Sequence, residues 1–74
     1  MTVNLIYPAF RWGDPPKGYA VGEARMTPRQ IIVESARVTS GRVLLGRLPL
    51  RFRRDNFLPI PYRDRGWRIQ AEGE

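Results

Sequence analysis

The sequence predicts an α+β fold, in which a small antiparallel sheet carries one short helix over about residues 28–39. Three observations predict this class. Segments rich in β-branched and aromatic residues occur near both ends of the chain. Between them, a helix-start signal precedes apolar residues at helical spacing. Seven glycines and seven prolines favour many turns and short elements. An all-β, SH3-like small barrel is the alternative if the central segment is extended.

The first part of the chain is expected to hold two strands joined by a loop. Residues 2–7 (TVNLIY) have the composition of a strand. Pro8 stops it, and the Gly- and Pro-rich residues that follow predict a flexible loop over about residues 8–18. Residues 19–25 (YAVGEAR) predict a second, weaker strand that Gly22 interrupts.

The clearest local signal lies at Thr27 and Gln30. A threonine followed three residues later by glutamine is typical of a capping box, and Pro28 suits the first position of a helix. The β-branched residues 31–33 weaken this prediction, because such side chains lose rotamer freedom in a helix. A helix would end near Gly41. One of its sides would carry Ile31, Ile32, Ser35, Ala36 and Thr39.

Short apolar segments after Gly41 predict strands of an irregular or edge character. The segments are 42–46, 48–53, 57–62 and 67–70. Three prolines within them cannot donate a hydrogen bond to a neighbouring strand, namely Pro49, Pro59 and Pro61. Residues 71–74 are expected to form a frayed tail. The chain is expected to be a single small domain, residues 1–74, because its length suits one hydrophobic core.

The composition argues against an enzyme. The chain contains no Cys and no His, which removes disulfides, zinc sites built on thiolate or imidazole, and catalysis by either side chain. The carboxylates are scattered, most of them close to an arginine, and no Gly-rich phosphate loop occurs. We therefore expect no catalytic residue, metal, cofactor or small-molecule substrate. No apolar run is long enough to span a membrane, and the start lacks signal-peptide character, so a cytoplasmic location without membrane contact is expected.

The positive charge of the chain is its strongest functional signal. The net charge is +6, and Lys17 is the only lysine among 13 basic residues. Arginine presents a planar fork of donors that matches phosphate and carboxylate. A GC-rich coding sequence would also favour arginine over lysine, although it would not explain the net charge. From Arg37 to Arg54 there are six arginines and no acidic residue. If residues 48–53 form a strand, Arg51 and Arg53 share one face.

Aromatic residues alternate with arginine in two segments, residues 10–12 and residues 62–68. On a surface such residues stack bases or anchor protein interfaces. We expect Phe52 and Trp67 to be buried instead, and Trp12 to be exposed in its loop. The candidate partner-binding residues are therefore Arg37, Arg42, Arg47, Arg51, Arg53, Arg54, Phe10, Arg11 and Trp12. The competing interpretation is a solvated surface whose charge serves solubility.

Two classes of function remain, a protein-binding regulator and a sequence-independent nucleic-acid-binding small domain. The segments MTVNLIYPAFRWGDPPKGY and RLPLRFRRDNFLPIPYRDRGW resemble the small transcription regulators that lytic bacteriophages encode. The resemblance implies docking on the large subunits of bacterial RNA polymerase in the host cytoplasm. It further implies interference with sigma factor and promoter engagement, with antitermination as another effect and nucleic acid as a secondary contact. That group shares no motif, so no binding residue is carried over from it.

Overall fold

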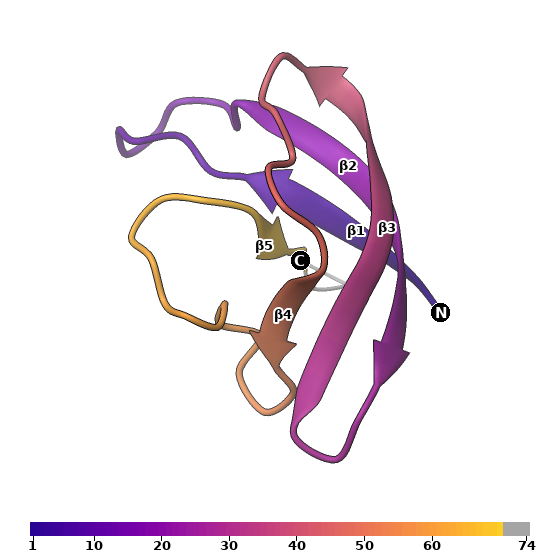
Figure 1. The fold of residues 1–74 in the computed structure, drawn as a ribbon. Helices are drawn as coiled ribbons and strands as arrows, with labels where there is room; N and C mark the ends of the chain where they lie inside the picture. Colours follow the sequence, from indigo (N-terminus) through magenta and orange to yellow (C-terminus); the bar gives the residue numbers. More distant parts are fainter. Residues whose placement is uncertain (71–74) are drawn as a thin grey trace.

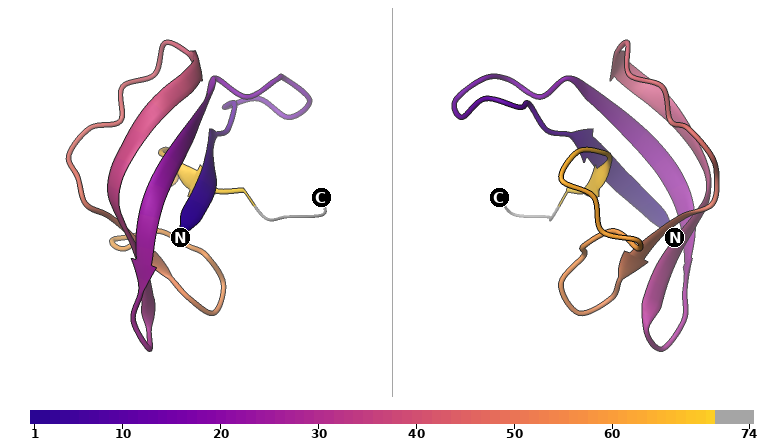
Figure 2. Two further views of the ribbon diagram at one scale, coloured as in Figure 1. Left: turned by 90° about the vertical axis from the view of Figure 1, so that its right-hand side faces the viewer. Right: turned by 60° about the vertical axis from the view of Figure 1, so that its left-hand side comes forward.

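Five antiparallel strands form one sheet (Figure 1). The structure is a computed structural model, and it describes residues 1–70. The strands are β1 (Thr2–Tyr7), β2 (Gly18–Met26), β3 (Gln30–Gly41), β4 (Leu50–Arg53) and β5 (Arg68–Ile69). Their order in the sheet is β4-β3-β2-β1-β5. The sheet curls into a small, nearly closed barrel, with β4 and β5 at its two edges (Figure 2).

The predicted α+β class is wrong, because the described residues contain no helix. The fold agrees with the all-β alternative, and β3 occupies the segment in which a helix over residues 28–39 was expected. Thr27 and Gln30 do interact: the Gln30 N–H donates to Thr27 Oγ1 at 3.0 Å. The Thr27 N–H also donates to the Gln30 carbonyl at 2.9 Å. These bonds close a tight turn between β2 and β3, so the same side-chain bond that caps a helix here serves a hairpin.

A β-bulge in β3 explains why its sequence does not alternate like a regular strand. Val33 pairs with Ala24, whereas Ser35 pairs with the preceding residue of β2, Glu23, so Glu34 is an extra residue. An extra residue exchanges the two faces of the strand beyond it. The side chains that pack into the core are accordingly Ile31 and Val33 before the bulge, and Ala36 and Val38 after it.

The core fills the inside of the barrel. Its buried members are Val3, Leu5, Ala20, Ala24, Ile31, Val33, Phe52 and Trp67. The expected burial of Phe52 and Trp67 is confirmed, since they are 1% and 5% exposed. β2 is the middle strand of the sheet, and its buried members of the core are small, namely Ala20 and Ala24. A Cβ on Gly22 would lie 2.7 Å from Val33 Cγ1, so this position admits glycine alone without rearrangement.

Ile32 is buried on the opposite, outer face of the sheet. Its exposed fraction is 4%, although it lies outside the core cluster. Its cross-strand partners are Arg25 on β2 and Arg51 on β4, which share its face. The aliphatic stems of long arginine side chains cover apolar neighbours while their charged ends stay in water. Ile32 is therefore sheltered by two arginines.

The C-terminal half has less regular structure than its sequence suggests. Residues 42–49 form no strand, and the segment 57–62 contributes an isolated bridge between Pro59 and Phe52. This segment still covers the outer edge of β4. The Arg53 N–H donates to the Leu58 carbonyl at 2.7 Å, and the Ile60 N–H donates to the Arg51 carbonyl at 2.8 Å. The expected frayed tail, residues 71–74, lies outside the described residues.

Candidate functional site

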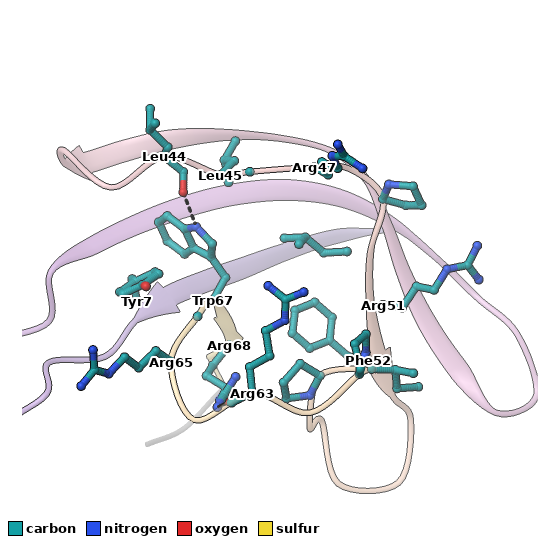
Figure 3. Close-up of a pocket in the computed structure, with 17 residues that line it drawn as sticks. Tyr7, Leu44, Leu45, Arg47, Arg51, Phe52, Arg63, Arg65, Trp67 and Arg68 are labelled. Carbon is teal, nitrogen blue, oxygen red and sulfur yellow. Dashed lines mark hydrogen bonds between the residues drawn. The ribbon is translucent and has the colours of Figure 1, made fainter.

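A cleft of about 610 Å³ opens between the two edge strands of the barrel (Figure 3). We refer to it as the arginine cleft. Its lining comes from β4, from the start of β5 and from the segments on either side of them. The lining residues are Tyr7, Leu44, Leu45, Gly46, Arg47, Pro49, Leu50, Arg51, Phe52, Pro59, Ile60, Pro61, Arg63, Arg65, Gly66, Trp67 and Arg68.

The wall of the arginine cleft is aromatic and fixed in position. Trp67 is held by a hydrogen bond from its indole Nε1–H to the Leu44 carbonyl, at 3.1 Å. The Tyr7 ring meets the Trp67 ring edge to face, with 5.4 Å between centroids and 83° between planes. Phe52 lies across the cleft from them (Figure 3). Phe52 and Trp67 belong to the buried core and Tyr7 packs against it, so the three rings give the site a rigid apolar base.

Five arginines and no carboxylate are found among the described residues that line the cleft. Arg63 and Arg68 lie near the middle of the site between Trp67 and Phe52, and Arg47 lies on the segment above them (Figure 3). The other two point outward. Arg65 extends away on the side of Tyr7, and Arg51 extends away on the far side of β4 (Figure 3). The site is therefore a cationic rim around an apolar base.

The charge of this rim is not neutralised by the carboxylates of the described chain. The three ion pairs among residues 1–70 join Arg25 to Glu34, Arg53 to Asp55 and the Met1 amine to Glu23. None of them involves an arginine of the cleft. Arg68 donates to the Arg63 carbonyl, and its Nη1 is buried without a hydrogen-bond partner in the described structure. Uncompensated guanidinium groups around a hollow attract anions.

The structure divides the run of arginines from Arg37 to Arg54 into separate groups. Arg51 and Arg53 share the outer face of β4, as predicted, while Phe52 points into the core. Both are already engaged: Arg51 donates to Gln30 Oε1 at 3.3 Å, and Arg53 donates to Asp55 at 3.0 Å. Arg54 donates to the Thr27 carbonyl at 3.3 Å. These bonds leave the guanidinium groups exposed but restrain them locally.

The other three arginines of that run lie elsewhere. Arg37 is exposed on β3, opposite Val21 of β2, and Arg42 follows the end of the strand. Arg47 joins the cleft. The run is therefore divided, since Arg47 and Arg51 line the cleft whereas Arg37, Arg42, Arg53 and Arg54 do not. The part that each arginine plays in binding stays a prediction.

Three cleft arginines, Arg63, Arg65 and Arg68, are absent from the residues predicted to bind a partner. The sequence does contain a signal for them, namely the alternation of aromatic and arginine residues over 62–68. Whether this alternation marks a binding site depends on which strands pair with one another in the sheet. β5 pairs with β1, which places this segment opposite β4 across the gap in the barrel.

The predicted binding loop divides into an anchored residue and a free one. Phe10 lies between two cations: Lys17 Nζ is 3.5 Å and Arg65 Cζ is 4.2 Å from its ring centroid. Trp12 has an exposed fraction of 103%, in agreement with its expected place on the surface. Arg11 is exposed beside it. Phe10 thus connects the loop to the cleft through Arg65.

The comparisons with known proteins add no family to this description. No protein-family model matches the chain, and neither a curated protein nor a solved structure is similar enough to count as a match. Residues 1–70 include no helix of the length and apolar character needed to cross a membrane. Within the same residues, no three His, Cys, Asp or Glu side chains gather in a way that could hold a metal ion. The chemistry of the site itself remains the guide to function.

Proposed function

We propose that this chain is a non-enzymatic binding protein that holds a single strand of DNA or RNA in the arginine cleft. The observation that carries the proposal is the set of arginines around the cleft, which no described carboxylate neutralises. Binding of a polyanion to such a surface releases condensed counterions, and this release supplies much of the affinity. A β-barrel with a cationic groove and nearby aromatic residues is a common arrangement for this task.

A single strand suits the site better than a duplex. Exposed aromatic side chains flank the cleft, and unpaired bases have free faces that can stack on them. Tyr62, next to the lining residues Pro61 and Arg63, is an example, with an exposed fraction of 61%. The described lining contains no Asn, Gln, Asp or Glu, the side chains that join arginine and lysine in reading base edges. We therefore infer that binding tolerates many sequences.

The test is a salt titration with a matched pair of variants. Fluorescence anisotropy measures binding of an oligothymidylate of about 12 nucleotides, a length within the usual site size of such folds. Salt is varied between about 50 and 200 mM. The variant Arg47→Ala/Arg63→Ala removes two cleft cations that form no hydrogen bond through their side chains with any described residue. Arg37→Ala/Arg42→Ala changes the net charge equally but lies outside the cleft.

The cleft variant is expected to bind more weakly, with the slope of log K against log salt reduced by about 1.4, since each lost phosphate contact removes about 0.7. The control variant should retain most of the wild-type affinity and slope. Two results would reject the proposal. One is an absence of binding by the wild type at low salt, and the other is an equal effect of the two variants.

A second candidate is docking on the large subunits of bacterial RNA polymerase, where the chain would interfere with transcription. The resemblance seen in the sequence supports it, as do Arg37 and Arg42, two exposed cations that lie outside the cleft. Cations in this position suit an acidic protein surface. Binding of immobilised chain to purified polymerase tests this candidate. Arg37→Glu/Arg42→Glu should weaken it more than Arg47→Glu/Arg63→Glu, the reverse of the order expected for oligonucleotides.

A further inference from the structure

The tip of the loop between β1 and β2 presents the aromatic ring of Trp12, which is fully exposed to solvent. Trp12 follows Arg11 in a turn closed by a hydrogen bond from the Asp14 N–H to the Arg11 carbonyl, at 3.3 Å. Gly13 takes a φ of +90° in this turn, a conformation that suits glycine. Trp12 is therefore placed by the backbone of a tight turn and not by burial, with its exposed fraction at 103%.

The base of this loop is fastened to the end of the arginine cleft. The Lys17 N–H donates to the Tyr7 carbonyl at 2.8 Å, which closes the loop where β1 ends. Arg65 lines the cleft and also lies over the Phe10 ring, 4.2 Å from its centroid. A second hollow, of about 280 Å³, shares Arg65 and Gly66 with the cleft and continues onto the loop at Phe10. The two hollows therefore adjoin at Arg65 and Gly66, and the second one reaches the loop at Phe10.

The electrostatic character changes along this path. Asp64 borders the second hollow, and Asp14 borders a third one on the loop itself. Each of these two hollows therefore has one carboxylate in its lining, whereas the described lining of the cleft has none. Phosphate groups are therefore favoured in the cleft and less so on the loop. What the loop offers to a ligand beyond the cleft is an aromatic face.

We propose that a base of the strand held in the arginine cleft stacks on Trp12, beyond the end of the cleft that Arg65 marks. This inference rests on the proposed function and extends the site to an outlying stacking position. Stacking requires no particular base, because each base has an aromatic face. It adds affinity without adding a phosphate contact, so it leaves the salt dependence of binding unchanged.

The test compares Trp12→Ala with Trp12→Phe and with a control, Tyr19→Ala. Tyr19 is a partly exposed aromatic residue of β2 that belongs to none of the three hollows. Two probes of about 12 nucleotides are titrated in the same salt series, an oligothymidylate and a strand of equal charge whose units lack bases. Far-UV circular dichroism verifies that each variant is folded.

Trp12→Ala is expected to lower affinity for the oligothymidylate at least about fivefold, the smallest factor usual for one stacked base. The salt slope should stay at its wild-type value, Trp12→Phe should lose less, and Tyr19→Ala should lose nothing. On the strand without bases, wild type and Trp12→Ala should bind equally. Equal binding of the oligothymidylate by wild type and Trp12→Ala would overturn the inference, as would an equal loss on both probes.

Failure of this inference is distinguishable from failure of the proposed function. If Trp12→Ala binds like the wild type while Arg47→Ala/Arg63→Ala still loses affinity and salt slope, the cleft holds the strand and Trp12 takes no part. If Trp12→Ala instead weakens binding to purified polymerase and leaves oligonucleotide binding intact, Trp12 is a protein anchor and the stacking inference is wrong. If the wild type binds no oligonucleotide, both proposals are rejected.

Discussion

The indole of Trp67 donates a hydrogen bond to the backbone carbonyl of Leu44, with 3.1 Å between nitrogen and oxygen. This contact joins the residue before β5 to a segment that forms no strand, 23 positions earlier in the chain. Leu44 is 87% exposed, while its neighbours Val43 and Leu45 pack against the core. The hydrogen bond therefore adds to this packing in positioning an irregular segment along the wall of the arginine cleft.

Replacement of Trp67 by phenylalanine should show how much this bond stabilises the fold. Trp67→Phe keeps an aromatic ring but leaves the Leu44 carbonyl without its donor. We expect the free energy of unfolding to fall by about 1–3 kcal/mol, as measured by urea denaturation followed by circular dichroism. Trp12→Phe is the matched control, and it should change stability by less than about 0.5 kcal/mol. Equal effects of the two changes would contradict the role given to this bond.

Substitution of two glycines with similar φ angles should distinguish the cost of steric overlap from the cost of backbone strain. Gly41 has a φ of +83°, and a Cβ there would lie 2.2 Å from the Lys17 carbonyl oxygen. Gly46 has a φ of +78° and open space around it. Gly46→Ala should destabilise by roughly 1–2 kcal/mol through backbone strain. Gly41→Ala should add about 1–3 kcal/mol through overlap. Urea denaturation measures both, and equal losses would show that the contact with Lys17 relaxes freely.

Arg51 is expected to stabilise the protein through its aliphatic stem. Ile32 is 4% exposed and pairs with Arg51 across the strands. Arg51→Ala removes the stem and should reduce the free energy of unfolding by about 1 kcal/mol. Arg51→Met keeps most of the stem without the charge, so its stability should stay close to that of the wild type. If both variants lose the same stability, the charge of Arg51 and its bond to Gln30 Oε1 contribute more than the contact of its aliphatic stem with Ile32.

The turn between β2 and β3 is expected to depend on the hydroxyl of Thr27, which accepts from the Gln30 N–H at 3.0 Å. Thr27→Ala should destabilise by about 0.5–1.5 kcal/mol, because that N–H loses its acceptor. Thr27→Ser keeps the hydroxyl and should remain nearer the wild type. Thermal unfolding by circular dichroism makes the comparison. A full loss in Thr27→Ser would attribute the effect to the methyl group instead.

The local sequence was sufficient to predict those strands in which buried and exposed side chains alternate regularly. The strand predicted over residues 2–7 coincides with β1, and the predicted strand 19–25 lies within β2. The predicted faces of β4 are also confirmed, because Phe52 is buried between two exposed arginines. In each case the period of two is uninterrupted, and burial follows from it directly.

The errors arise where local and long-range information differ. The sequence of β3 indicates a helix because the bulge at Glu34 breaks its alternation, and because Thr27 makes a bond that both a helix cap and a turn can use. The arginine cleft could not be predicted from the spacing of residues along the sequence. Arg47 and Arg63 line the same cleft only because β5 pairs with β1 and β4 pairs with β3. A net charge indicates that cations are present, but the topology decides which of them converge.

The segment that covers β4 has a consequence for the behaviour of the chain in concentrated solution. The bonds from Arg53 to Leu58 and from Ile60 to Arg51 already occupy polar groups on that side of β4, and Pro59 between them offers no N–H. The opposite border is a strand of two residues, too short to template a neighbour. These two borders therefore offer a neighbouring molecule little backbone to pair with, and mutual repulsion of the positive surfaces adds to this protection.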